Sequence, residues 1–215
     1  MKHKKIIILT ICLFISAISI LAVDKIYDVK ILKCTSDNSF NNSNDLNSNI
    51  KNGIYKAAMD FAKTTTWVYD PSYYKITYPN GDVPSGGACT DLVTRVLRKN
   101  KMDLQQLIHE DMVSNFSAYP KNWGLNKPDA NIDHRRVPNI MTYFKRQHYD
   151  VPITANGKDY LPGDIVCWVL SPGINHIGIV LENQDVFHNM GPTSRIQSGF
   201  LFSCKIIGHY RIKMD

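Results

Sequence analysis

The sequence has few cysteines, glycines and prolines, and it has no strong excess of charge of either sign. Among its 215 residues there are five cysteines, 12 glycines and 10 prolines, while 44% of the residues are hydrophobic and 20% are charged. Cysteines this sparse exclude a disulfide-rich scaffold, and the overall composition excludes a collagen-like repeat, a disordered chain and a multi-span membrane protein. No internal repeat is visible, so one globular domain preceded by a tail is expected.

The positive net charge gives little support to a nucleic-acid partner. The formal charge is +6, but Lys2, Lys4 and Lys5 stand before the rest of the chain, which is close to neutral without them. The other basic residues are scattered rather than arranged in a stripe that could follow a phosphate backbone. We therefore predict no nucleic-acid binding.

The N-terminal segment indicates export. Residues 6–23 form an apolar run that follows the lysines and is interrupted only by one threonine and two serines. A run of this length suits either a signal peptide or a membrane anchor, so residues 1–23 are predicted to be one or the other. Residues 24–49 contain a stretch rich in Asn and Ser and are predicted to form a flexible tether. The domain at 50–215 is therefore expected in the cell envelope or outside the cell, secreted or anchored.

Within this domain, hydrophobic spacing predicts helices first and strands afterwards. Helices are expected at 50–65, at 88–100, from Asp103, whose pairing with Gln106 suggests a capping box, to about 116, and from Pro138 onward. Short β-type runs follow at 165–169, 176–181, 185–188 and 204–211. Residues 182–185 predict a hairpin, and helices followed by an antiparallel sheet indicate an α+β fold.

Cys89 stands at the predicted start of a helix, directly after the glycine-rich approach at 84–88. A thiol in this position faces unpaired backbone N–H groups and the positive end of the helix dipole, which favour a thiolate and can stabilise an oxyanion. The apolar positions of the helix share a face with Cys89 and are expected to pack on the sheet. A buried structural cysteine is the alternative.

Two histidines on neighbouring predicted strands supply groups that a nucleophilic cysteine needs. Strand alternation places His176 and Gly178 on one face and Ile177 on the other. We expect Gly178 to mark the close approach of the Cys89 helix, so that His176 meets the thiol and acts as a general base. The predicted hairpin brings His188 beside His176 as an orienting group.

These residues resemble, in order and spacing, the NlpC-type cell-wall endopeptidases, a branch of the papain-like cysteine peptidases. The matching features are Tyr78, the Gly86–Gly87 approach to Cys89, the Pro-Gly-Asp strand entry at 162–164, the His-Ile-Gly-Ile-Val strand at 176–180, and His188. The stretch between the cysteine helix and Pro162 is longer than usual in that family. The chain looks like an uncharacterised bacterial subfamily of predicted exported proteins.

The resemblance implies a papain-like fold and hydrolysis of an amide bond in peptidoglycan stem peptides, without a metal or another cofactor. Cys89 is then the nucleophile, His176 the proton shuttle and His188 its orienting partner. Tyr78, Asp91 and Asn189 are expected on the oxyanion or substrate side, although the family usually has a Ser-Gly pair where this chain has Thr90 and Asp91. Charged and aromatic residues of the inserted stretch are candidates for substrate binding, namely Trp123, His134, Arg135 and Arg136.

Three alternatives remain open from the sequence. One is a papain-like domain without activity that binds cell-wall polymer or a partner, and another transfers the acyl group to an acceptor other than water. The third is a zinc amidase, for which the chain has enough ligand types but no fitting spacing. Its candidate ligands are His109, Glu110, Asp111, Asp133, His134, His176 and His188.

Overall fold

Five antiparallel strands form the sheet that organises the fold. The computed structural model describes residues 53–212, so the predicted export segment and tether lie outside the described residues. The strands are β1 (Ile165–Ser171), β2 (Ile174–Val180), β3 (Val186–Asn189), β4 (Ser194–Gln197) and β5 (Lys205–Tyr210), and their order across the sheet is β4-β3-β2-β1-β5. Within residues 53–212, no helix is long and apolar enough to cross a membrane.

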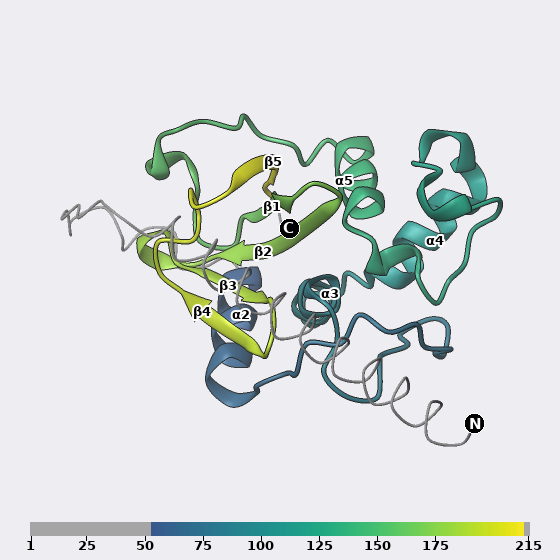
Figure 1. Ribbon diagram of the computed structural model, residues 1–215, viewed down its shortest axis with the longest axis horizontal. Coiled ribbons are helices and arrows are strands. Elements are labelled where there is room, and N and C mark those ends of the chain that lie inside the picture. Colours follow the sequence, from purple (N-terminus) through teal and green to yellow (C-terminus); the bar gives the residue numbers. More distant parts are fainter. Residues whose placement is uncertain (1–52, 213–215) are drawn as a thin grey trace, which may run out of the picture. The chain divides into compact units, whose positions relative to one another are not determined.

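Four α-helices precede the sheet in the described part of the chain. They are α2 (Gly53–Thr64), α3 (Cys89–Lys99), α4 (Leu104–Asn115) and α5 (Val137–Arg146). Helix α3 contacts β2 and β3, while α4 and α5 pack against each other beyond α3 (Figure 1). Figure 1 also shows α2 close to the β3 and β4 end of the sheet. The helices therefore cover the sheet mainly through α3, which carries Cys89.

The two faces of the sheet pack into different cores, because successive side chains of a strand point to opposite faces. The larger core joins all four helices to one face, which is formed by Ile165, Cys167, Ile177, Ile179 and Phe187. The opposite face packs in a smaller core around Trp168 and Phe200. Both cores exclude water from the middle of the sheet, and apolar burial of this kind is the main stabilising contribution to folding.

The α+β class and the order of elements predicted from the sequence are confirmed. The hairpin at 182–185 is also confirmed, since the Leu181 amide donates to the Asp185 carbonyl at 2.7 Å. The capping box expected at Asp103 is wrong: its carboxylate makes no cap bond and instead accepts from Arg98 and from the Asn80 amide. Strand β4 has no counterpart in the prediction, because its four residues include a single apolar side chain and show no strand pattern.

Asp164 anchors the entry to β1. It is fully buried and accepts hydrogen bonds from the Leu161 amide, from His209 Nε2 and from the Arg211 guanidinium at 2.7–2.8 Å. Burial by itself raises the pKa of Asp164, but the donors from Arg211, His209 and Leu161 outweigh it and leave the pKa below its usual value. The Pro-Gly-Asp segment thus ties the start of β1 to the end of β5.

We predict that Asp164→Asn lowers the free energy of unfolding by about 3 kcal/mol, because it leaves buried donors without their charged acceptor. Since the folded pKa is depressed, the contribution of Asp164 is complete above its unfolded pKa of about 4 and is lost as the pH falls through the folded value. Urea unfolding at pH 7 and pH 3 measures both effects. Asp60→Asn, at an exposed position on α2, is the control and should unfold like the wild type.

Candidate active site

The turn that leads into α3 is held by backbone and side-chain hydrogen bonds from residues 68–70, from β3 and from α3 itself. The Gly87 amide donates to the Val68 carbonyl at 3.0 Å, and the Gly87 carbonyl accepts from the Asp70 amide at 3.1 Å. Asn189 on β3 donates to the same Gly87 carbonyl at 2.7 Å, and Arg95 Nη1 donates to the Gly86 carbonyl at 2.6 Å. These contacts fix the backbone that immediately precedes Cys89.

Asp91 closes the first turn of α3 from within. Its Oδ2 accepts a hydrogen bond from the Ala88 amide at 2.6 Å, in the position where an acidic residue also favours the helix dipole. Arg135, in the short helical turn Asp133–Arg135, donates to both carboxylate oxygens of Asp91 at 2.9–3.1 Å. Both side chains are almost completely buried, with 1% and 3% exposure.

This arrangement corrects two expectations. Asp91 was expected on the oxyanion side and Arg135 was a candidate for substrate binding, but the two side chains satisfy each other and the α3 turn. Arg135 also donates to the carbonyl of Ser72. A buried, bidentate arginine–carboxylate pair has few donors left for a ligand. Both residues therefore position Cys89 rather than face solvent.

Cys89 is buried at the end of the larger core, with 6% of its surface exposed. The backbone amides of Ile177, Thr90 and Cys89 itself act to lower the pKa of its thiol. Burial raises the pKa of the thiol to about 11 in spite of these donors, and the nearby Asp91 charge acts in the same direction. The resting sulfur is consequently a neutral thiol that lies against the peptide group joining His176 to Ile177.

The side-chain alternation predicted for β2 is confirmed, but the face that meets α3 is the other one. Cys89 packs in the larger core with Ile177, whereas the His176 ring lies against Trp168 and Phe200 of the smaller core. Gly178 does not mark the approach of α3, since a Cβ there would meet Val186 and His188 of β3 at 2.9 and 3.1 Å. Bulky aliphatic side chains, rather than the His-Gly pair, make the interface with the helix, so the expected contact between His176 and the Cys89 thiol is not made.

His176 and His188 form a hydrogen-bonded relay with a defined proton arrangement. His176 Nε2 and His188 Nδ1 are 2.9 Å apart, and His188 Nε2 lies 3.1 Å from Gln197 Oε1. Arg195 Nε, which can only donate, also points at Gln197 Oε1, so this atom is the amide oxygen. His188 therefore donates through Nε2 and accepts at Nδ1. His176 then donates through Nε2 and carries a lone pair on Nδ1.

Both imidazoles are neutral in the resting state. Burial and the positive charge of Arg195 together lower the pKa of His188 to about 3, although the hydrogen bond with Gln197 acts in the opposite direction. Burial, followed by His188 and Arg195, holds the pKa of His176 well below its ordinary value. Among residues 53–212 no hydrogen bond joins His176 Nδ1 to a partner, nor does one join the Cys89 sulfur to an imidazole. The Nδ1 lone pair is available as a base.

The remaining predicted residues are divided between two regions. Asn189 lies with Cys89 through its bond to Gly87, and its buried Oδ1 has no partner among the described residues. Tyr78 does not join them: it packs edge-on against His109 at 5.2 Å, and its hydroxyl donates to Glu110. The expectation that Tyr78 lies at the oxyanion side therefore has no support in its contacts.

The substrate-binding candidates of the inserted stretch also differ in their exposure to solvent. His134 is only 2% exposed, and burial lowers its pKa to about 3, so a surface role for it is wrong. The Arg136 guanidinium stacks 4.3 Å above the Trp123 ring, which is 58% exposed. This pair is the part of the predicted set that faces solvent. Its role in binding stays a prediction.

The side chains considered for a zinc site are not brought together. His109 pairs with Asp133 at 3.0 Å, Asp111 pairs with Arg146, and the His176–His188 relay belongs to the sheet. Within residues 53–212, no group of three or more His, Cys, Asp or Glu side chains is placed to hold a metal ion.

Two polar residues of the site were missed from the sequence. Gln197 completes the histidine relay from β4, and Arg95 holds the Gly86 carbonyl from α3. Gln197 could have been found only with the register of β4, whose Gln197 pairs with Val186. Arg95 lies about two turns after Cys89 on the same helix. Its basic side chain in a mostly apolar stretch could have indicated from the sequence that it has a buried partner.

Comparison with known proteins places the chain in a family. The model of a family described as a domain of unknown function (DUF1287) matches residues 55–212. The chain belongs to this family. It is also similar to the uncharacterized protein YijF of Escherichia coli (strain K12), with 48% identity over 154 residues, which cover 68% of this chain and 75% of that protein. No solved structure matches.

We predict that Gly87→Ala in this DUF1287 domain disrupts the turn before Cys89. Gly87 has φ +130°, and an added Cβ would lie 2.8 Å from Asp91 Oδ2. The free energy of unfolding should fall by about 1–3 kcal/mol, as expected for a residue forced into a strained conformation. Gly173→Ala is the matched control, because Gly173 has φ +81° with no atom near its Cβ position. Equal losses for both variants in urea unfolding would contradict the close contact with Asp91.

Proposed function

We propose that the protein is an exported cysteine hydrolase that cleaves an amide bond in peptidoglycan stem peptides. The observation that carries the proposal is the effect of the Ile177 amide on the Cys89 thiol, whose pKa it lowers. This amide belongs to the peptide bond that joins His176 to Ile177, so the thiol lies beside the backbone of the proposed base. The His176 ring projects from the opposite face of β2, toward Trp168 and Phe200, so the proposed reaction requires a rearrangement that brings Nδ1 to the thiol.

In the proposed reaction, His176 Nδ1 takes the proton of the Cys89 thiol as the sulfur attacks the substrate carbonyl carbon. The amides of Cys89 and Thr90 at the start of α3 then donate to the oxyanion. The imidazolium of His176 gives its proton to the leaving amine, and a thioester remains on Cys89. Water, deprotonated by the same Nδ1, hydrolyses the thioester and restores the thiol.

The histidine relay supports His176 as the base. Hydrogen bonding from Nε2 to His188 fixes the tautomer in which Nδ1 accepts a proton, and Gln197 fixes the tautomer of His188 in turn. Because both imidazoles have lowered pKa values, the relay remains neutral across the physiological pH range, and His176 Nδ1 keeps a lone pair but is a weak base. A neutral thiol with a pKa of about 11 then requires proton transfer to be coupled to attack.

The resemblance to NlpC-type peptidases supports the substrate class and the papain-like fold. The α3 start, the Pro-Gly-Asp entry to β1 and the two histidines of β2 and β3 follow that family's order. On this proposal residues 6–23 direct export or anchor the domain in the membrane, and residues 24–49 let it reach the cell wall. A non-catalytic binding domain is the second candidate, and the observation in its favour is the deep burial of the Cys89 thiol.

The test is incubation of the full-length protein with purified peptidoglycan sacculi, followed by mass spectrometry of released fragments. We expect stem peptides to be released, release to be abolished by Cys89→Ala, and His176→Ala to lower the rate by about 10²- to 10⁴-fold. Cys204→Ala is the matched control, because Cys204 packs against the smaller core, away from α3. Chelator should have no effect.

Three other results have distinct meanings. Release that survives Cys89→Ala but stops with chelator would contradict the thiol mechanism and favour a metal amidase. Fragments whose new carboxyl end carries an added amine would indicate acyl transfer. Absence of release, with the wild type still sedimenting with sacculi, would favour the binding domain.

A further inference from the structure

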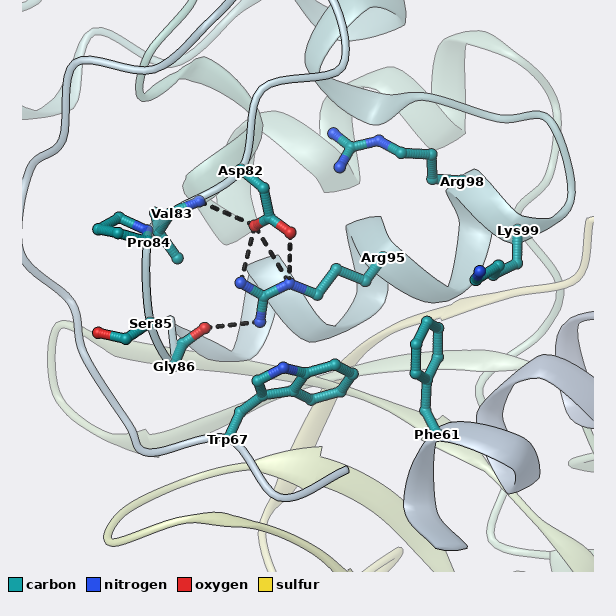
Figure 2. Close-up of a pocket in the computed structure, with 10 residues that line it drawn as sticks. All are labelled: Phe61, Trp67, Asp82, Val83, Pro84, Ser85, Gly86, Arg95, Arg98 and Lys99. Atoms are coloured by element: carbon teal, nitrogen blue, oxygen red, sulfur yellow. Dashed lines mark hydrogen bonds and ion pairs between the residues drawn. The ribbon is translucent and has the colours of Figure 1, made fainter. Parts of the chain in front are cut away.

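A separate groove lies on the other side of the turn that precedes Cys89. It has a volume of about 600 Å³ and is lined by α2, α3 and residues 82–86, which lead into the Gly87 turn. Cavities of this size are within the usual range for ligand-binding pockets. Figure 2 shows Trp67 and Phe61 along one side, Arg95 between Trp67 and Asp82, and Lys99 beside Phe61.

The groove contains more hydrogen-bond donors than free acceptors. Asp82 supplies the only carboxylate among its lining residues, and this carboxylate is already bound by the Arg95 guanidinium and by the Val83 amide. Lys99 Nζ, by contrast, has no carboxylate partner among the described residues and lies 5.8 Å from the centre of the Phe61 ring. The Trp67 indole N–H and the Ser85 hydroxyl likewise have no partner in the described part of the chain.

A ligand that satisfies these donors must bring acceptors and a negative charge. The Arg95 guanidinium stacks 4.8 Å from the centre of the Trp67 ring, so the centre of the groove is held rigid by an ion pair on an aromatic surface. Trp67 and Phe61 pack against each other at 5.0 Å and offer apolar surface for the aliphatic part of such a ligand. Lys99 at one end and Ser85 at the other are placed to bind its oxygens.

We propose that this groove binds the side-chain carboxylates of an acidic peptide. That the ligand is a peptide rests on the proposed function, because residues 84–86 of the groove directly precede the Gly87 turn into Cys89. That the ligand is anionic rests on the groove alone. Lys99 makes the principal charged contact, and Ser85 and the Trp67 indole add neutral donors.

Fluorescence titration of the full-length protein tests the proposal. Trp168 is fully buried, so Trp123→Phe removes the other exposed tryptophan and leaves Trp67 as the reporter. The probes are acetyl-(Glu)₃-amide, its uncharged analogue acetyl-(Gln)₃-amide, and inorganic phosphate. We expect the Glu peptide to change the Trp67 emission saturably, and the Gln peptide to bind far more weakly.

Lys99→Gln should weaken binding of the Glu peptide by about fivefold, as for loss of one exposed ion pair, and Lys99→Glu should weaken it further. Lys145→Gln is the matched control, because Lys145 is also an exposed lysine in the last turn of a helix, and it should bind like the parent protein. Equal binding of the Glu and Gln peptides, or no effect of either Lys99 variant, would overturn the proposal. Phosphate binding as tight as that of the Glu peptide would overturn the carboxylate assignment.

The same titration with Cys89→Ala separates this proposal from the proposed function. We expect Cys89→Ala to bind the Glu peptide with unchanged affinity, since Cys89 does not line the groove. Cys89-dependent release from sacculi together with failed binding would contradict the groove alone. Binding without any Cys89-dependent release would contradict the hydrolase alone.

Discussion

The buried ion pair between Asp91 and Arg135 is the interaction on which the arrangement around Cys89 depends. The Asp91 carboxylate accepts a hydrogen bond from the Ala88 amide at the start of α3. Arg135, which belongs to the inserted stretch between α3 and β1, forms an ion pair with the same carboxylate. Removing one partner of such a pair leaves an uncompensated buried charge, which costs about 3–5 kcal/mol. The inserted stretch between α3 and β1 thus contributes to holding the start of α3.

A second set of contacts joins this turn to the sheet. Asn189 on β3 binds the Gly87 carbonyl, and the amide that follows His176 lowers the pKa of the Cys89 thiol. The histidine relay lies on β2 and β3, with its protons ordered by Gln197. Cys89 packs on one face of the sheet and the His176 ring on the other, so the proposed hydrolase requires the two to be brought together.

Much of this fold follows from local sequence patterns. Helical spacing around Val93 and Val96 and strand alternation through Ile177 and Ile179 identified α3, β2 and the core between them. The sequence did not determine which face of the sheet packs against α3, because alternation separates the side chains into two faces but does not tell what each face packs on. The roles of Asp91 and Arg135 were also out of reach, since these residues are 44 positions apart and meet only through the tertiary fold. The strand with Gln197 was not recognised, because its four residues include a single apolar side chain.

Amide hydrogen exchange in Asp91→Asn tests most directly whether the Asp91 carboxylate holds the turn that carries Cys89. Loss of a charge-assisted hydrogen bond of about 1.5–3 kcal/mol predicts exchange at Ala88 and across residues 86–90 at least about tenfold faster than in the wild type. Amides in the middle of β1 and β2 should accelerate less, and Asp60→Asn should leave the whole pattern unchanged. Unaltered exchange at residues 86–90, or acceleration no greater there than in β1 and β2, would contradict the account.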